Sequence, residues 1–419
     1  MRTEASSASH HHPPKVLLVG YNGANNTGSE ARLLSIIEDV RRVFGPEAVI
    51  SVPTLNERNL RRYITESDTL RIEPIPSIFI FSMKRLIRNS DLVMLVEGSC
   101  YMDTWASSLL YAFNLTSRYS RQLGKPSIAY AVDSGKLAPK RIARVKRDAS
   151  ALDLLITRTR SSADRLKKWG VTAPIAVTDD TAFTFDAGAE EGTLKRIWPD
   201  VKGGVAGISV VDFSLWPVVL RPFGRRENCY RWPYYFSTSK ERCQRSEDFA
   251  VHYAGEADRI VERYNKSVAL IAMEAVDEKM AKHVVAHMHH RDRAKVFSSN
   301  EHDAATMTRV LRSLDLLITS RYHASVLSMA AGVPQMAVGH DLRLHDLYVE
   351  SGLHDEFFIE CESKNLWNDL PRVVDRLASE HDSIQQRILA INARHTEMAK
   401  KNAELLREFA KSKGLPVVG

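Results

Sequence analysis

Short β-rich runs alternate with helix-like stretches along most of the chain, and this alternation constrains the fold more than any other feature. Strands that are separated by helices do not pair as hairpins, so the pattern predicts parallel sheets covered by helices on both faces. The predicted strands span residues 16–19, 92–96, 127–131, 154–157 and 174–177 in the first half, and 204–210, 267–273, 294–297, 315–319, 335–338 and 357–359 in the second half. The predicted helices include 33–44, 138–149, 161–169, 246–264, 277–290, 304–314 and 323–331.

The two sets of strands predict two domains. A chain of 419 residues is too long for one compact domain and long enough for two. We predict a disordered tail over residues 1–14, a Rossmann-like N-terminal domain over 15–195, a Rossmann-like C-terminal domain over 196–370 and a helical segment over 371–419. We expect the two Rossmann-like domains to face a cleft and the C-terminal helices to pack back over the body.

Composition narrows the class of protein. The chain is 44% hydrophobic and 26% charged, as is typical of a soluble globular protein, and its longest apolar runs are far short of the roughly 20 residues that span a bilayer. The first fifteen residues are polar and lack the apolar core of a signal peptide. The four cysteines are scattered and form no C-x-x-C pair, which favours a reducing compartment. We therefore predict a cytoplasmic protein.

The net charge of +7 suits an anionic small molecule, an anionic membrane surface or nucleic acid. The basic residues are spread out and match no nucleic-acid-binding signature, so we predict no nucleic-acid partner. The densest basic and aromatic patch, RPFGRRENCYRW at 221–232, lies in a stretch (212–245) without clear periodicity. A long irregular loop inside an α/β domain is more often functional than not, and a solvated loop stays the alternative.

The segment VLLVGYNGANNTGSEARLL (16–34) reads as a strand, a turn rich in glycine and asparagine, and a helix. This layout aims backbone N–H groups at an anion. The spacing is neither G-x-G-x-x-G nor that of a P-loop, so it favours no particular nucleotide. The turn could also be a tight connection without a ligand.

Polar residues follow several predicted strands, at the edge of a parallel sheet where ligands bind. They are Glu97, Gly98 and Ser99 after 92–96, Arg158 after 154–157, Arg321 and His323 after 315–319, and His340, Asp341 and Arg343 after 335–338. Arginine binds carboxylates and phosphates through paired hydrogen bonds, and histidine exchanges protons near neutral pH. The set predicts an anionic substrate and a proton-coupled group transfer. Arg158 could instead start a surface helix, and Asp341 could simply cap one.

His283 and His287 share one face of a predicted helix and could hold zinc. Because no third ligand follows at a zinc-site spacing, we favour a solvated helix and predict no metal site.

Five segments, in chain order, resemble the polysaccharide pyruvyl transferase family. The opening GYNGANNTGSE matches the family pattern G-x-x-G-x-x-N-x-G-D-E at Gly20, Gly23, Asn26, Gly28 and Glu30, with Ser29 in place of Asp. DLVMLVEGSCYMD resembles the family's strand and glycine-rich turn, although Glu97 and Ser99 replace glycines and only Gly98 remains. LLITRTRSSADRLKKWGV and VTDDTAF resemble two further segments. DLLITSRYHASVLSMAAGVP resembles the family's R-x-H turn, which places Arg321 and His323 ahead of a helix and Gly-Val-Pro.

The resemblance implies a GT-B-like arrangement and transfer of a pyruvyl group from phosphoenolpyruvate to sugar hydroxyls, as a ketal, with phosphate released. It implies a role for Arg321 and Arg158 in holding the donor's anionic groups and for His323 in proton transfer. The expected substrate-binding residues are Gly23, Asn26, Gly28, Glu30, Gly98, Ser99, His340 and Arg343. No metal or redox cofactor is required, and the partners are phosphoenolpyruvate and a sugar or lipid-linked saccharide.

The departures at Ser29 and Glu97 could change the acceptor, or mark a relative that no longer transfers pyruvate. Two alternative functions stay open. One is a GT-B-type glycosyltransferase with a nucleotide-sugar donor, and the other is a non-catalytic anion- or glycan-binding relative. A lipid-linked acceptor would make peripheral association with the inner membrane face reasonable. The aromatic and basic stretch 212–245 is the expected acceptor platform. The sequence does not indicate an oligomeric state.

Overall fold

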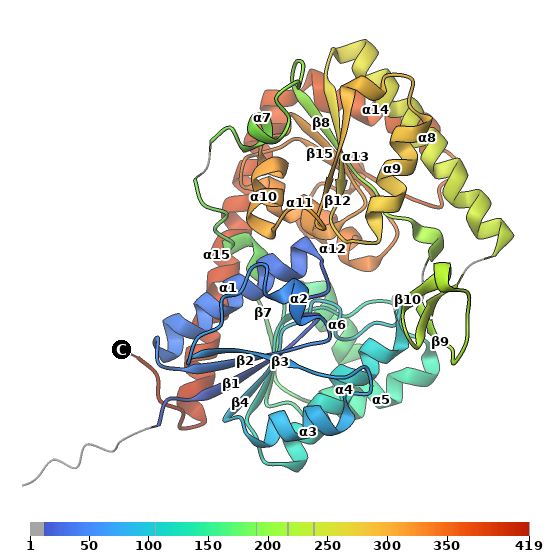
Figure 1. Ribbon diagram of the computed structural model, residues 1–419. Coiled ribbons are helices and arrows are strands. Elements are labelled where there is room, and N and C mark those ends of the chain that lie inside the picture. The colour runs from blue at the N-terminus through green and yellow to red at the C-terminus, as the bar shows by residue number, and fades with distance from the viewer. Residues whose placement is uncertain (1–11, 105, 190, 216–217, 238, 419) are drawn as a thin grey trace, which may run out of the picture.

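The structure is a computed structural model that describes residues 12–104, 106–189, 191–215, 218–237 and 239–418. The disordered tail predicted over 1–14 falls almost entirely outside these residues. The described chain forms two parallel sheets, each covered by helices, one above the other (Figure 1).

The first sheet has seven parallel strands in the order β3-β2-β1-β4-β5-β6-β7. Its strands are β1 (Lys15–Val19), β2 (Val49–Thr54), β3 (Leu70–Pro74), β4 (Leu92–Leu95), β5 (Ser127–Val132), β6 (Leu154–Thr157) and β7 (Ile175–Val177). The central strands β4 and β5 are buried along their whole length, as strands covered on both faces must be. The helices of this half are α1 (Thr27–Phe44), α2 (Glu57–Leu60), α3 (Ile80–Arg88), α4 (Ser107–Gln122), α5 (Pro139–Ala149) and α6 (Arg160–Lys168), with the 3₁₀ helix η1 (Thr181–Thr184) after β7.

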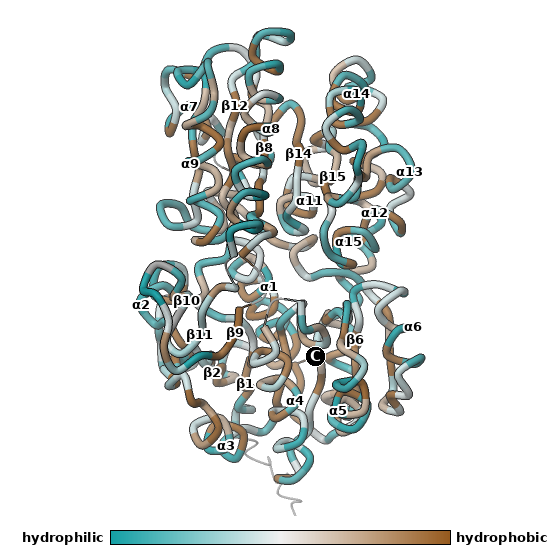
Figure 2. The backbone as a smooth tube through the Cα atoms, turned by 90° about the vertical axis from the view of Figure 1, so that its right-hand side faces the viewer, coloured by the Kyte–Doolittle hydropathy of each residue, from teal (hydrophilic) through white to brown (hydrophobic). Residues whose placement is uncertain are grey.

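The second sheet has six parallel strands in the order β13-β12-β8-β14-β15-β16. They are β8 (Val205–Ser209), β12 (Ser267–Ala272), β13 (Ala294–Ser298), β14 (Leu316–Thr319), β15 (Gln335–Gly339) and β16 (Phe358–Glu360). The helices of this half are α7 (Thr193–Ile197), α8 (Lys240–Tyr264), α9 (Asp277–His287), α10 (Ala304–Arg312), α11 (Tyr322–Met329), α12 (Leu342–Glu350), α13 (His354–Phe357) and α14 (Leu366–Ser379), with the 3₁₀ helices η2 (Phe213–Leu215), η3 (Arg226–Asn228) and η4 (Arg291–Arg293). Figure 2 shows hydrophobic segments concentrated in the strands of both halves.

The stretch 212–245 is more regular than its sequence indicates. It forms a small antiparallel sheet in the order β10-β11-β9, built from β9 (Val218–Leu220), β10 (Cys229–Arg231) and β11 (Tyr234–Phe236). A bridge between Ala106 and Val218 joins this insertion to the first half of the chain. The insertion therefore leaves the second domain and rests on the first.

Helix α15 (His381–Ser412) ties the two halves together (Figure 1). Its first turns place Ile384 and Ile388 in the core of the second half, and its last turns place Leu406 and Phe409 in the core of the first half. Midway, buried His395 stacks on Phe183 with 4.8 Å between ring centroids and lies 2.8 Å from the Asp179 carboxylate through Nδ1. The expectation of C-terminal helices packing back over the body is confirmed.

Every strand predicted from the sequence is present, and β2, β3 and the small sheet were not predicted. Pro53 and Pro74 lie within β2 and β3, where proline weakens the strand pattern. The boundary near residue 195 stays a proposal, and it lies between the last strand of the first sheet, β7, and the first strand of the second, β8. Among the described helices, none combines the length and the hydropathy that crossing a membrane requires.

If α15 holds the halves together, Leu406→Ala should cost about 2–5 kcal/mol of unfolding free energy, because a fully buried leucine leaves a cavity. Leu389→Ala on the same helix is the matched control, since that side chain is 36% exposed. Chemical denaturation of both variants measures the difference. Equal costs would show that the end of α15 does not stabilise the first domain.

Candidate functional site

A cavity of about 450 Å³ lies between the two halves of the chain and draws its walls from both. The first half contributes the turn after β1, the segment that runs into α3, and residues after β4 and at the start of α4. The second half contributes the ends of β12 and β14, Arg343 of α12, and Val218, Tyr230 and Tyr234 of the insertion. The cavity thus forms at the carboxyl ends of strands of both sheets, the usual ligand position in such domains.

The glycine–asparagine turn also forms backbone hydrogen bonds with the second half of the chain. Asn26 caps α1 by accepting a hydrogen bond from the Ser29 N–H at 3.1 Å, and the Thr27 N–H donates to the Met273 carbonyl at 2.8 Å. The Ala275 N–H donates to the Asn25 carbonyl at 3.1 Å. Two N–H groups in the first turn of α1, those of Thr27 and Ser29, therefore already have protein partners.

Arg321 lies in the cavity wall between two carboxylates. Its Nε donates to Asp277 at 2.8 Å, its Nη2 pairs with the same carboxylate, and its Nη1 lies 3.1 Å from Glu274 Oε2. Burial raises the pKa of the Asp277 carboxyl to about 6, even though the Arg321 charge lowers it. Burial lowers the pKa of the Arg321 guanidinium, but both carboxylates outweigh that effect and keep it charged.

Glu274 is the second carboxylate of this wall, and it has further partners. The Asn26 amide donates to its Oε2 at 3.2 Å and the Tyr21 hydroxyl to its Oε1 at 3.4 Å. Glu274 therefore keeps two donors if Arg321 turns towards a ligand.

Behind the cavity wall, the Asp180 carboxylate contacts three basic side chains. Its Oδ2 lies 2.6 Å from Arg32 Nη1, pairs with Arg158 Nη1, and lies 3.6 Å from His323 Nε2. Burial would raise the pKa of the Asp180 carboxyl, yet the two arginines hold it well below its usual range. Burial lowers the pKa of His323, with Asp180 opposing that shift. The lowered pKa favours the neutral imidazole, which is the form that can accept a proton.

Two of the motif glycines make room for these basic side chains. A Cβ on Gly28 would overlap the His323 ring, and a Cβ on Gly98 would lie 2.7 Å from Arg158 Nη1. Arg158 is fully buried, pairs with Asp133 and Asp180, and lies 4.0 Å from the centroid of the Tyr322 ring. Gly28 and Gly98 thus leave the space that the His323 and Arg158 side chains occupy.

The structure brings together six of the predicted site residues in the lining of the cavity: Gly23, Asn26, Ser99, Arg321, His323 and Arg343. Gly28, Gly98 and Arg158 do not line it and lie in the layer behind, so anion binding by Arg158 stays a prediction, and its two carboxylate partners favour a positioning role. The remaining two, Glu30 and His340, lie outside both layers.

Glu30 and His340 are both buried beside protein groups. The Asn59 amide donates to Glu30 at 3.3 Å, and burial raises the pKa of this carboxyl to about 7. His340 packs on Phe213 with 4.5 Å between ring centroids, and burial lowers its pKa to about 4. Neither lines the cavity, and substrate binding by either remains untested.

Sequence reasoning missed the carboxylates that hold the basic residues. Asp180 lies in the VTDDTAF segment that supports the family resemblance, but nothing in that segment marks it as a partner of Arg32. Glu274 lies in the connection after β12 and Asp277 begins α9, so the rule applied to the other strand ends would have found them. The stretch 212–245, predicted to be the acceptor platform, places Tyr230 and Tyr234 in the cavity lining. Trp232 of the same stretch does not line the cavity and is 61% exposed.

The comparison with known families matches this chain over most of its length. The sequence model described as "Polysaccharide pyruvyl transferase" matches residues 26–341. The chain therefore belongs to the polysaccharide pyruvyl transferase family. A search of curated proteins found no significant match.

Solved structures with a similar fold cover nearly the whole chain. They include a putative UDP-N-acetylglucosamine 2-epimerase from Listeria monocytogenes (12% identity, 96% of both chains, TM-score 0.59) and S. aureus MnaA in a co-structure with UDP (11% identity, 96% of this chain and 98% of that one, TM-score 0.61). A glycosyltransferase from Rickettsia africae is also similar (12% identity, 96% and 100% of the chains, TM-score 0.55). At these identities the similarity shows the fold alone, which is the GT-B fold expected from the sequence.

Gly28→Ala tests the contact that places His323. We expect a loss of about 1–3 kcal/mol of unfolding free energy, because the added methyl group would overlap the imidazole. Gly255→Ala on α8 is the control: its Cβ would meet no atom within 4 Å, so it should be neutral or stabilise by up to about 1 kcal/mol. Thermal and chemical unfolding measure both. An unchanged stability of Gly28→Ala would mean that the His323 ring does not pack against α1.

Proposed function

We propose that this protein transfers the pyruvyl group of phosphoenolpyruvate to two hydroxyls of a sugar, as a ketal, in the biosynthesis of cell-surface polysaccharides or glycoconjugates. One observation carries the proposal: the R-x-H turn of the family, Arg321 and His323, lies in the wall of the cavity between the two domains. The cytoplasm is the expected location, because phosphoenolpyruvate is a metabolite of that compartment.

The charges in the wall suit a donor and an acceptor together. The charged lining residues are Arg321, Arg343, Glu97 and Glu274. Arginine forks fit the carboxylate and phosphate of phosphoenolpyruvate, and carboxylates accept hydrogen bonds from sugar hydroxyls. Tyr230 and Tyr234 add aromatic surface on the insertion side, on which a sugar ring can pack.

Donor binding would exchange one ion pair for another. A donor carboxylate or phosphate would compete with Glu274 for Arg321 Nη1, which now lies 3.1 Å from Glu274. Asp277 would keep its two contacts with the same guanidinium and hold it in orientation. The donor thus gains a positioned arginine without leaving Glu274 unpaired.

The reaction needs a group that moves protons beside the donor. The proton of the first sugar hydroxyl goes to the methylene carbon, that hydroxyl oxygen bonds to C2, and the second hydroxyl displaces phosphate, which leaves with the second proton. A neutral His323 can take the first proton and pass it on, with Asp180 stabilising the imidazolium. Asp180 is held ionised by Arg32 and Arg158, so it serves as a fixed negative charge.

Thermal unfolding with phosphoenolpyruvate, followed by phosphate release with candidate acceptors, tests the proposal. At about a hundred times its Kd, a ligand that binds only the folded state adds roughly 2.7 kcal/mol. We expect this stabilisation in the wild type and in Arg372→Ala, whose side chain is 79% exposed, and its loss in Arg343→Ala. His323→Gln should keep the stabilisation and lose phosphate release.

Other outcomes identify the alternatives. Stabilisation by a nucleotide sugar and not by phosphoenolpyruvate would contradict pyruvyl transfer and support a glycosyltransferase. Unchanged phosphate release in His323→Gln would contradict the proton-transfer role. Binding of phosphoenolpyruvate without release of phosphate in the presence of any acceptor would support a non-catalytic binding protein.

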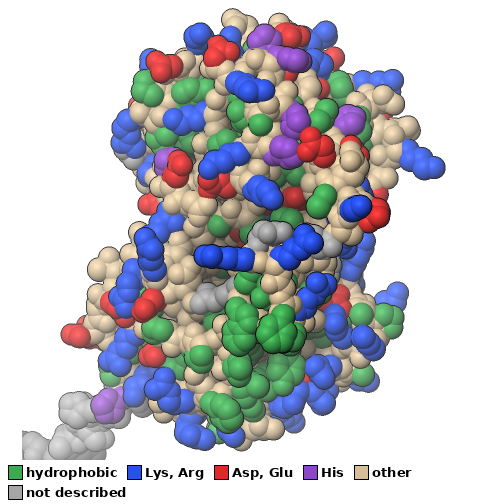
Figure 3. Space-filling model, turned by 45° about the vertical axis from the view of Figure 1, so that its right-hand side comes forward, with side chains coloured by type: hydrophobic (Ala, Val, Ile, Leu, Met, Phe, Trp, Pro, Cys, Tyr) green, Lys and Arg blue, Asp and Glu red, His purple; other side chains and the backbone are tan. Residues whose placement is uncertain are grey.

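We also propose that the acceptor is linked to a lipid and that the protein docks on an anionic membrane surface. The two segments that line the cavity from the α3 side and from the insertion also expose large apolar side chains: Ile78, Phe81, Leu220, Phe223 and Trp232. Exposed basic residues stand beside them in sequence: Lys84, Arg85, Arg221, Arg225 and Arg226. Figure 3 shows hydrophobic side chains gathered on one face with Lys and Arg around them. Such surfaces bind anionic lipids.

Co-sedimentation with vesicles that contain anionic lipid tests this docking. Phe81 and Phe223 are 84% and 86% exposed, and the double variant Phe81→Ser, Phe223→Ser should lower vesicle binding about tenfold or more. Val349→Ser, 46% exposed on α12, is the control and should bind as the wild type does. Equal binding by all three proteins would remove the docking surface from the proposal.

A further inference from the structure

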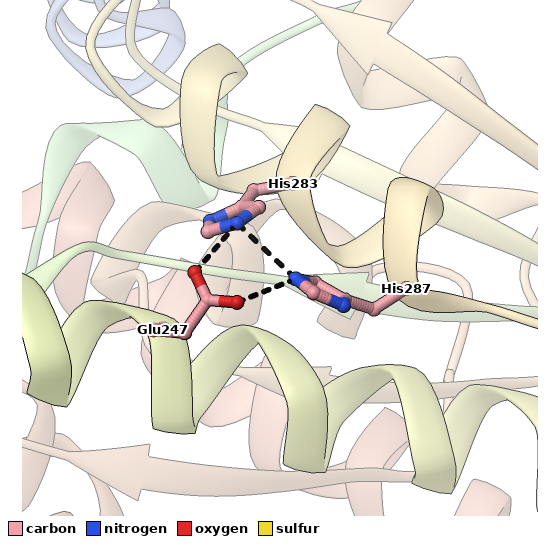
Figure 4. A group of neighbouring side chains, drawn as sticks. All are labelled: Glu247, His283 and His287. Atoms are coloured by element: carbon pink, nitrogen blue, oxygen red, sulfur yellow. Dashed lines mark hydrogen bonds and ion pairs between the residues drawn. The ribbon is translucent and has the colours of Figure 1, made fainter.

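Three side chains form a compact cluster outside the cavity, where α8 and α9 pack together. His283 and His287 lie one turn apart on α9 and point towards Glu247 of α8 (Figure 4). His283 Nε2 lies 2.9 Å from Glu247 Oε2, His287 Nε2 lies 2.9 Å from Glu247 Oε1, and the two Nε2 atoms are 3.2 Å apart. The third ligand that the helix spacing lacks is thus supplied by a second helix.

The spacing of these atoms matches a tetrahedral zinc site. Bonds of 2.0–2.1 Å place neighbouring ligand atoms of tetrahedral zinc about 3.3 Å apart. The three separations in the cluster, 2.9, 2.9 and 3.2 Å, need only a small expansion to reach that value. Imidazole nitrogen and carboxylate oxygen are both normal zinc ligands.

The cluster is rigid at its base and open at its top. Neighbouring residues of the same two helices, Ala250 on α8 and Met280 and Val284 on α9, are buried in one core, which fixes the helices. The ligand side chains are 33–43% exposed, so solvent can supply a fourth ligand. Three protein ligands with one open position are typical of zinc bound with water.

Without a metal ion, the close approach of the two histidines in this cluster is unfavourable. For both histidines to bond to Glu247, each Nε2 must carry a proton, and the two N–H groups then lie side by side with 3.2 Å between their nitrogens. A divalent ion replaces both protons and is attracted to all three ligand atoms.

We propose that Glu247, His283 and His287 bind one divalent ion of the zinc class, with water as the fourth ligand, and that this ion joins α8 to α9. Glu247 lies about two turns into α8, and α8 begins four residues after β11 of the insertion. The ion would therefore fix the start of α8 and the base of the segment whose Tyr234 lines the cavity. This site is independent of the proposed pyruvyl transfer.

Zinc titration against a chromophoric chelator, without any substrate, tests the site. All proteins should carry His10→Ala, His11→Ala and His12→Ala, because three consecutive histidines bind the same ions. We expect one zinc per chain, at least a tenfold loss of affinity in His283→Ala and in Glu247→Gln, and wild-type affinity in the control His289→Ala. Cobalt bound to the same protein should show the strong visible absorption of a tetrahedral site.

Stability gives a second readout. Zinc should raise the denaturation midpoint of the control and leave that of His283→Ala unchanged, because only the folded chain brings the ligands together. Without metal the variants should fold normally, since the three side chains are partly exposed. Zinc binding of equal strength in the control and the cluster variants, no bound zinc, or an octahedral cobalt spectrum would each overturn the proposal.

Discussion

The arrangement of the two domains and of the site depends on the contacts of one buried carboxylate, that of Asp180, with three basic side chains. It brings together Arg32 from α1, Arg158 from the end of β6 and His323 from α11, and its other oxygen accepts the Ala182 N–H at 2.8 Å. Removing one partner from a buried ion cluster typically costs 3–5 kcal/mol, because the remaining charges stay out of water. Arg32 and Arg158 belong to the first domain and His323 to the second, so the same carboxylate orients a cavity residue and holds the domain interface.

The fold was largely predictable from the sequence, because buried parallel strands leave continuous apolar runs. Strands such as 127–131 and 315–319 are recognisable for that reason. β3 was not recognisable because it lies at the sheet edge, is partly exposed and reads as the mixed segment LRIEP. The strands of the insertion have three residues each, which is too short for any alternation to show.

The site was predictable only at the level of single strand ends. Arg321 and His323 follow β14 directly, so position in the chain is enough to identify them. Their partners come from distant segments, since Asp277 is 44 residues from Arg321, and only the folded structure brings them together. Glu30 matches a motif position, yet α1 turns it towards Asn59 and outside the cavity lining, so its role in substrate binding stays a prediction. The proposed metal site could also be predicted only in part. The helical spacing places His283 and His287 on one face, but only the packing of α8 against α9 shows that Glu247 joins them.

The structure places the two departures from the family pattern in the wall of the same cavity. Ser29 stands where the family has Asp, Glu97 stands where it has Gly, and both residues line the cavity. The wall has thus lost a carboxylate at the start of α1 and gained one after β4. Glu97 accepts hydrogen bonds from the Ser99 N–H at 3.2 Å and hydroxyl at 3.0 Å, so the new carboxylate is held in place by its own turn. If the protein transfers pyruvyl groups as proposed, a carboxylate at a different place in the wall would change which sugar hydroxyls it can bind, while Arg321 and His323 stay unchanged. Under the proposed function, the departures therefore fit a different acceptor better than a loss of the transfer chemistry.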